Sequence, residues 1–158
     1  MILIKKVDKS NIKEAAKIHS VSWQKSHSDI CNADFIKIHT PERQEQYIVN
    51  KLRSGSEFYI LFAGEKPVGV VSIKDNIIED LYVLPDEQNK GYGSKLLVFV
   101  MKKCDKKSLL WILETNTKTE NFYKKFGFKR TGKTLDIGKG LKQIEFCCES
   151  SHLFHSFP

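Results

Sequence analysis

The 158-residue sequence contains only four cysteines, four prolines and no long uninterrupted apolar run. None of the cysteines forms a C-x-x-C pair, and no histidine follows them at a zinc-finger spacing, so we expect reduced thiols and no bound metal. No segment approaches the roughly 20 apolar residues that cross a bilayer. Residues 1–7 lack the apolar core of a signal peptide. The sequence therefore predicts a soluble, cytoplasmic protein with no membrane partner.

Basic residues outnumber acidic ones, with 26 Lys and Arg against 19 Asp and Glu and a formal net charge of +7. Such an excess fits an anionic ligand, a nucleic acid or an acidic partner, and does not choose among them. The lysines are scattered along the chain, and clustered arginines and aromatic-basic repeats are absent. Nucleic-acid binding is therefore only a remote alternative, and we expect no nucleic-acid partner.

Length and composition predict one domain over residues 1–158. A chain of this size can bury its own core, and it contains no internal repeat, linker or low-complexity segment. Residues 150–158 are expected to be a flexible or packed tail. Hydrophobic periodicity predicts a mixed, mainly antiparallel sheet flanked by helices, an α/β or α+β fold. The expected elements are strand 2–7, helix 10–23, a short helix around 35–38, a helix from residue 40, three strands within 57–84, a helix after residue 91, strand 108–114, helix 117–127 and strands 128–136 and 141–148.

Several boundaries follow from local residue chemistry. Ser10 is expected to cap the first helix, and Thr40 and Pro41 to be the N-cap and first residue of another. Residues 108–114, SLLWILE, are nearly all apolar, which predicts a strand buried on both faces. Gly127 suits the C-terminal cap of the helix before it.

The segment Gly91-Tyr92-Gly93 follows a predicted strand and opens an apolar helix. Glycine-rich loops at this position commonly bind anions, because free N–H groups and the helix dipole point outward. The segment lacks the third glycine of a dinucleotide fingerprint and the G-K-[ST] end of a Walker A loop. Taken alone it fits either an anion cradle or a tight turn.

The linked motifs resemble the GNAT superfamily of acetyl-CoA-dependent N-acetyltransferases. Residues 77–85, IIEDLYVLP, and 87–97, EQNKGYGSKLL, match the family's L-Y-V-x-P strand, [QR]-x-x-G-x-[GA] loop and apolar helix. Residues 109–132 match its buried strand, Asn, short helix with Phe-Tyr, and Gly-Phe. The match covers roughly residues 58–149 and departs at Thr119, where the family often has Ala. The resemblance implies a single N-acetyltransferase domain with splayed central strands and acetyl-CoA as co-substrate.

The resemblance also implies which residues bind coenzyme A. The pyrophosphate is expected on the backbone of the loop, with Gly91 and Gly93 allowing close approach. The pantetheine arm is expected to pair with backbone groups of the preceding strand, and Asn116 to hydrogen-bond it from the opposite wall. Lys90 adds positive charge, although a solvated lysine explains it equally well. The predicted cofactor-binding residues are Leu81, Tyr82, Val83, Gln88, Asn89, Lys90, Gly91, Tyr92, Gly93, Ser94 and Asn116.

Two residues are candidates for proton transfer. By the same resemblance, Tyr123 of the Phe-Tyr pair donates a proton or a hydrogen bond to the thiolate leaving group. Glu79 lies two residues before Leu81, which predicts that it shares that strand face, while Asp80 points the other way. The resemblance implies that a carboxylate on this face acts as the base, directly or through water, although a half-exposed strand carboxylate explains Glu79 equally well. His19 is expected to be a core histidine, and His27 a surface loop residue.

The acceptor stays open at this stage. By resemblance, specificity comes from about residues 20–40 and 134–141, and a small amine, an aminoglycoside, a protein N-terminus or a lysine side chain all fit. Asp29, Asp34 and Glu42 are available to bind a cation, although solvated surface carboxylates explain them better. A non-catalytic acyl-CoA-binding or regulatory module of the same fold is the main alternative, and either a monomer or a homodimer is expected.

Overall fold

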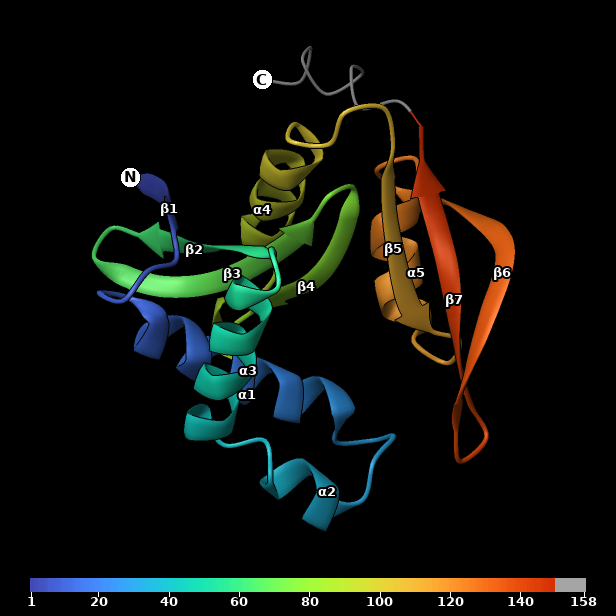
Figure 1. Cartoon of the computed structure of the whole chain (residues 1–158), viewed down its shortest axis with the longest axis horizontal. Helices are drawn as coiled ribbons and strands as arrows, with labels where there is room; N and C mark the ends of the chain where they lie inside the picture. The colour runs from blue at the N-terminus through green and yellow to red at the C-terminus, as the bar shows by residue number, and fades with distance from the viewer. Residues whose placement is uncertain (150–158) are drawn as a thin grey trace.

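One seven-stranded sheet, with strand order β1-β2-β3-β4-β5-β7-β6, organises the chain in this computed structural model, which describes residues 1–149 (Figure 1). Neighbouring strands are antiparallel except β4 and β5, so the sheet is mixed and mainly antiparallel as predicted. The strands are β1 (Ile2–Lys6), β2 (Glu57–Ala63), β3 (Lys66–Lys74), β4 (Ile77–Val83), β5 (Ser108–Leu113), β6 (Lys129–Gly138) and β7 (Leu141–Cys148).

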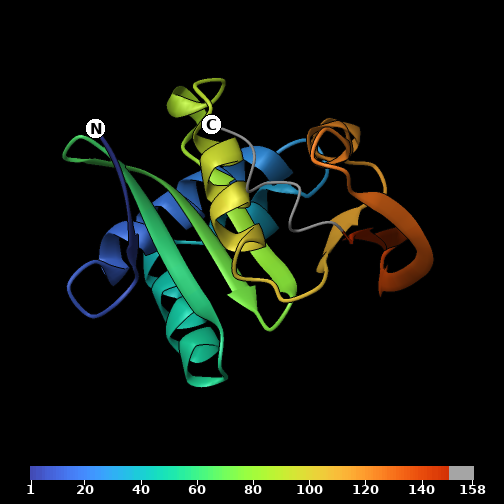
Figure 2. The ribbon, with the colours of Figure 1, turned by 90° about the horizontal axis from the view of Figure 1, so that it is seen from above.

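Helices cover the sheet unevenly. Helices α1 and α3 pack on one face of the β1–β4 half and α4 on the other, while α5 lies beside β5 and β7 (Figure 2). No helix within residues 1–149 is long and apolar enough to cross a membrane. The helices are α1 (Ile12–His27), α2 (Ala33–Lys37), α3 (Pro41–Arg53), α4 (Tyr92–Met101) and α5 (Thr117–Lys124), with a short 3₁₀ turn at Pro85–Glu87.

Two helix starts show how local chemistry acts. The Thr40 hydroxyl accepts the Arg43 N–H at 3.2 Å and α3 begins at Pro41, which confirms that prediction. The prediction for Ser10 is wrong. Its N–H and hydroxyl both donate to Asp8 Oδ1, at 2.8 and 2.5 Å, so its side chain is engaged before the helix starts and Asn11 takes the N-cap position.

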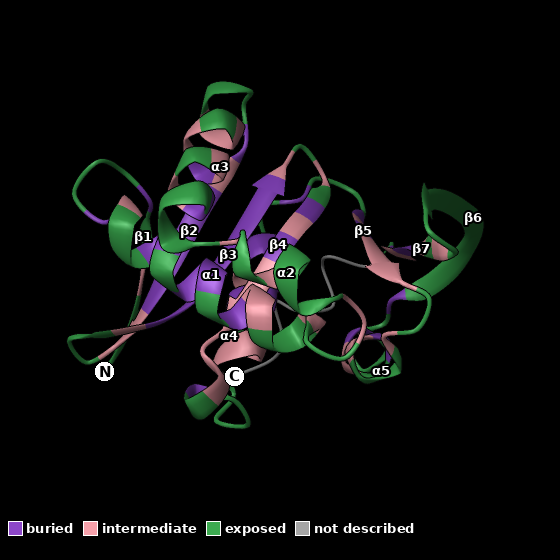
Figure 3. Cartoon of the chain, turned by 90° about the horizontal axis from the view of Figure 1, so that it is seen from below, coloured by how far each residue is buried: buried purple, intermediate pink, exposed green. Residues whose placement is uncertain are grey.

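The core of residues 1–149 consists of two apolar clusters, one on each face of the sheet. Strand β2 contributes to both, because Phe58 and Ile60 point toward α1 and α3 while Tyr59 and Leu61 point toward α4. Burial is concentrated in β2 and β3, whereas β6 is exposed along its whole length (Figure 3). Each fully buried side chain of this kind stabilises the fold by about 1.5–3 kcal/mol.

Strand β5 corrects the prediction of burial on both faces. Only Ser108 and Leu110 are buried, and the alternate residue Leu109 lines an open groove instead. The apolar run therefore lies in a strand with one covered face, whose buried Leu110 belongs to the same apolar cluster as Tyr123 of α5.

Strands β4 and β5 separate after a short parallel contact. They pair only at Ile77–Leu109 and Ile78–Leu110, and β4 then continues to Val83 with β3 as its sole strand neighbour among the described residues. The splayed central strands are therefore present. On the β3 side, Ser72 pairs with Asp80 and Ile73 with Ile78, which leaves Glu79 as an extra residue in a β-bulge.

Candidate functional site

A cleft of about 560 Å³ opens where β4 and β5 diverge. One wall is β4 with the loop that follows it, the other is α5, and the end of α1 closes one side. Most of the predicted site residues gather here from segments distant in sequence. The cleft is lined by Lys25, Ser26, Asp29, Leu81, Val83, Glu87, Gln88, Asn89, Gly91, Tyr92, Gly93, Ser94, Asn116, Lys118, Thr119, Phe122 and Tyr123.

The glycine loop forms the N-terminus of α4 at this cleft. Gly91 is the N-cap with φ +86°, a left-handed conformation that favours glycine, and no side chain in the described part of the chain caps the helix. Asn89, two residues earlier, is also left-handed at φ +64°. A Cβ on Gly93 would lie 3.7 Å from Phe122, so the backbone runs close to the opposite wall. Uncapped N–H groups and the helix dipole make this a suitable place for an anion.

Two lysines lie beside the loop and share one carboxylate. Glu87 accepts hydrogen bonds from Lys66 at 2.6 Å and from Lys90 at 3.0 Å. These bonds hold the pKa of Glu87 below its usual value. Lys90 does not line the cleft itself, but its ammonium group is hydrogen-bonded to Glu87, which does. Neither Lys66 nor Glu87 is among the site residues predicted from the sequence. The three-residue spacing between Glu87 and Lys90 does indicate an ion pair between them.

Strand β4 presents its backbone and alternate side chains to the cleft. Leu81 and Val83 line it, whereas Tyr82 faces the other side and its ring packs against His19 with centroids 4.8 Å apart. The three residues pair with Gly69–Val71 of β3. Their groups on the β5 side have no strand partner within the described chain, which suits an extended ligand that hydrogen-bonds to the edge.

The opposite wall carries Asn116 and Tyr123 on α5. Asn116 is the N-cap, and its Oδ1 accepts the Thr119 N–H at 3.2 Å. Tyr123 is 6% exposed, with its ring edge-on to Phe122 and Phe128. Its hydroxyl makes no hydrogen bond with any residue in 1–149. Burial raises the pKa of this phenol and keeps it protonated.

Glu79 does not lie where its spacing from Leu81 predicted. Its carboxylate accepts hydrogen bonds from Lys51 of α3 at 2.5 Å and from Ser56 at 2.8 Å, and it does not line the cleft. The expected shared face is wrong because the bulge adds one residue to β4 and breaks the two-residue alternation at Glu79. Its role as a base remains a prediction without this geometric support.

Of the two histidines considered from the sequence, one is buried in the core and the other lies at the end of α1, and all three carboxylates considered are exposed. His19 is 2% exposed and bonded on both ring nitrogens, so it is a core histidine as expected. His27 is the last residue of α1, not a loop residue, and it stacks on Trp23 with centroids 4.0 Å apart. Burial lowers the pKa of His27. Asp29 is exposed at the cleft, while Asp34 and Glu42 are exposed elsewhere.

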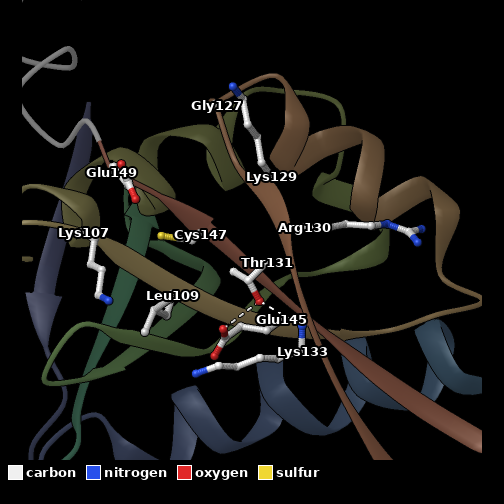
Figure 4. A pocket seen from close by; sticks show the side chains of 10 residues that line it. All are labelled: Lys107, Leu109, Gly127, Lys129, Arg130, Thr131, Lys133, Glu145, Cys147 and Glu149. Carbon is white, nitrogen blue, oxygen red and sulfur yellow. Dashed lines mark hydrogen bonds between the residues drawn. The ribbon is translucent and has the colours of Figure 1, made fainter.

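A second groove lies on the face of β5, β7 and β6 that no described helix covers (Figure 4). Thr131 donates a hydrogen bond to Glu145 at 2.9 Å within it. The groove mixes charges of both signs and contains none of the predicted site residues. It is lined by Lys107, Leu109, Gly127, Lys129, Arg130, Thr131, Lys133, Glu145, Cys147 and Glu149. Nowhere in residues 1–149 do three or more His, Cys, Asp or Glu side chains gather in a way that could hold a metal ion.

Comparison with known proteins adds an independent line of evidence. A family model described as "Acetyltransferase (GNAT) domain" matches residues 13–148. A Mycobacterium tuberculosis protein named as a probable N-acetyltransferase is 26% identical over 156 residues, covering 92% of this chain and 89% of the relative.

Solved structures share the fold. The PaiA N-acetyltransferase of Thermoplasma acidophilum, in complex with coenzyme A, superimposes with a TM-score of 0.71 at 22% identity, covering 92% of this chain and 98% of that one. An N-acetyltransferase from Rhodopseudomonas palustris gives a TM-score of 0.75 at 17% identity, with coverage of 93% and 94%.

Proposed function

Because the chain belongs to the GNAT family of acetyltransferases, we propose that it transfers the acetyl group of acetyl-CoA to a primary amine of a small molecule or a protein. The transfer occurs by direct attack in a ternary complex. The observation that carries this proposal is the pair of features that line one cleft. Within residues 1–149, the N-terminus of α4 in its wall has no side-chain cap, and the Tyr123 hydroxyl in the opposite wall has no hydrogen-bond partner. The Thermoplasma relative crystallised with coenzyme A supports the choice of ligand.

Each part of coenzyme A has a complementary group in one of the two walls of the cleft. The pyrophosphate binds the N–H groups of the loop between Gln88 and Ser94, where Gly91 and Gly93 permit close approach. Lys66 and Lys90 add positive charge beside the loop. The amides of the pantetheine arm pair with the free edge of β4 at residues 81–83. Asn116 keeps its amide N–H groups for the arm, because only its Oδ1 is used by the cap.

The proposed chemistry has one clear donor. The amine nitrogen attacks the acetyl carbonyl, the carbon–sulfur bond breaks, and the thiolate receives a hydrogen bond and then a proton from Tyr123, whose phenolate regains a proton from water in the cleft. A raised phenol pKa keeps this donor protonated throughout the accessible pH range.

The amine must also lose a proton. Among the lining carboxylates, Glu87 is engaged by two lysines and Asp29 is exposed at the end of α1. We therefore propose that water in the cleft accepts the proton in place of Glu79.

Two measurements test the function. Calorimetry with coenzyme A tests binding, and an acceptor screen read by free-thiol release from acetyl-CoA tests transfer. Binding together with amine-dependent thiol release is the expected result. Tight binding without release for any class of primary amine would favour the non-catalytic acyl-CoA-binding module, and absence of binding would overturn the proposal.

A further inference from the structure

A buried polar network lies beneath β4, on the side away from the cleft. At its centre, Asp80 Oδ1 is 3.0 Å from His19 Nε2, and its Oδ2 accepts the Ser72 hydroxyl at 2.6 Å. The Tyr47 hydroxyl is 3.2 Å from both carboxylate oxygens. Gln44 completes the network, with its amide nitrogen 2.7 Å from His19 Nδ1. The Asp80 carboxylate is therefore hydrogen-bonded to side chains of α1, α3 and β3.

The network holds a charge that burial alone would neutralise. The side chains of His19 and Asp80 are only 3% and 8% exposed. Burial opposes ionisation of Asp80, but the hydrogen bonds from His19, Ser72 and Tyr47 outweigh it and lower the pKa of the carboxyl group. A carboxylate with this many partners has a fixed position, because any displacement would leave a buried charge without its hydrogen bonds.

Asp80 occupies the point where the sheet forks. It follows Ile78, the last β4 residue paired with β5, and the bulge residue Glu79. Beyond it, no strand among residues 1–149 pairs with β4 on the cleft side to hold it in place. Two residues further along β4, the ring of Tyr82 packs against His19. The network therefore also contacts the part of β4 that is not paired with β5.

We propose that the Asp80–His19 pair positions residues 81–83 of β4 at a fixed separation from β5, so that the free strand edge is set to receive the pantetheine arm. This inference rests on the proposed function, since it assigns the cleft to coenzyme A. Asp80, His19 and Tyr47 are positioning residues, because they contact β4 and its neighbours and not the ligand.

The proposal predicts that the network affects binding of the pantetheine arm of coenzyme A but not binding of its phosphates. Adenosine 3′-phosphate 5′-diphosphate carries the phosphates of coenzyme A but no pantetheine arm, so its binding depends on the glycine loop alone. Asp80→Asn should weaken coenzyme A binding by about tenfold or more, as expected when a buried charge-assisted hydrogen bond is lost. Binding of the arm-free nucleotide should change by less than about twofold. Calorimetry with both ligands measures the difference.

A pair of tyrosine variants provides a milder test that does not remove a buried charge. Tyr47→Phe removes a hydroxyl bonded to Asp80, whereas Tyr59→Phe removes a hydroxyl bonded to Glu57 on β2, away from the cleft. Tyr47→Phe should weaken coenzyme A binding selectively, and Tyr59→Phe should leave both ligands unaffected. This pair decides the question even where Asp80→Asn fails to fold.

The outcomes are distinct. Equal weakening of both ligands, or equal effects of the two tyrosine variants, would show that the network only stabilises the fold and would overturn the inference. Failure of the unmodified protein to bind either ligand would overturn the proposed function instead.

Discussion

At the scale of single residues, the tyrosine hydroxyls differ in what they contact. The Tyr47 hydroxyl is committed to Asp80, and the Tyr59 hydroxyl donates to Glu57 at 2.5 Å. Tyr123 has a ring fixed by aromatic neighbours, but its hydroxyl bonds to nothing within residues 1–149. Tyr123 lines the cleft, and its hydroxyl oxygen is not a buried unpaired polar atom among the described residues, so water or a ligand in the cleft can hydrogen-bond to it. This contrast supports a functional use of the Tyr123 hydroxyl.

Replacing Tyr123 by phenylalanine should affect turnover far more than binding. The ring packing survives, and coenzyme A affinity should change by about the worth of one hydrogen bond, ~1 kcal/mol. Turnover should fall on the order of 10²-fold or more, the usual range for a positioned proton donor. Calorimetry and single-turnover kinetics measure the two effects, with Tyr59→Phe as the control. Unchanged turnover under conditions where chemistry limits the rate would return Tyr123 to a packing role.

Glu79→Gln should leave the pH–rate profile parallel to that of the unmodified protein. The carboxylate is held by Lys51 and Ser56 outside the cleft, so its loss should not remove a proton acceptor. The measurement is turnover with one good acceptor across the neutral and alkaline range. A loss confined to pH values below about 8, where most amines are protonated, would instead establish Glu79 as the base.

At the scale of elements, the glycine loop and α4 form one structural unit, because Gly91 is the N-cap of the helix. Gly91 has left-handed φ, and a Cβ added there would meet nothing within 4 Å. A substitution at this position therefore strains the backbone without a steric clash, at a cost of about 1 kcal/mol. Any larger effect on coenzyme A binding must therefore come from an interaction between the new side chain and the phosphates of the ligand.

Gly91→Glu should abolish coenzyme A binding in a protein that still folds. The added carboxylate would crowd and repel the phosphates at the helix N-terminus. Gly64→Glu is the matched control, because Gly64 also has positive φ, +65°, and open space around its Cβ, but it lies in the β2–β3 turn. Calorimetry compares the two variants after circular dichroism has verified folding. Equal affinity in both would remove the loop from the site.

The elements also show which features a sequence encodes locally. The Thr40-Pro41 helix start and the Gly91-x-Gly93 loop depend on neighbouring residues, and both were predictable. The face of Glu79 was not, because the bulge arises from pairing with β3. The partial exposure of Leu109 on β5 depends on tertiary packing, which the strand's own apolar run does not encode. The contact between His19 and Asp80 joins residues 61 positions apart, which no local pattern can reveal.

At the scale of the whole molecule, the sheet consists of two halves joined by a short contact between β4 and β5. Within residues 1–149, the β1–β4 half has helices on both faces, whereas the β5–β7–β6 half has one open face. Within the described residues the cleft lies at their junction, so its shape depends on how each half holds its own strand. On the β4 side, the Asp80 network provides this restraint, and its ionisation links the junction to pH.

Asp80 should therefore contribute stability that is lost in acid. Its folded pKa is lowered below the ordinary value of 3.8, so the unfolded chain binds more protons as the pH falls through that range. The free energy of unfolding should decrease as the pH falls from about 3.8 through the folded pKa, and the full contribution should be present above about pH 5. At neutral pH, Asp80→Asn should cost on the order of 2 kcal/mol, because His19, Ser72 and Tyr47 lose a charged partner.

The stability difference between the unmodified protein and Asp80→Asn should accordingly shrink with acid. Urea denaturation at a series of pH values measures it, since the midpoint and slope give the free energy of unfolding at each pH. Glu57→Gln is the matched control: its carboxyl pKa is also lowered, by Tyr59, but its side chain is 44% exposed, so solvent screens the interaction and the difference should be small at every pH. A stability difference for Asp80→Asn that stays constant from neutral pH into the acid range would show that the carboxylate is not ionised in the fold, and the network would then hold β4 through neutral hydrogen bonds alone.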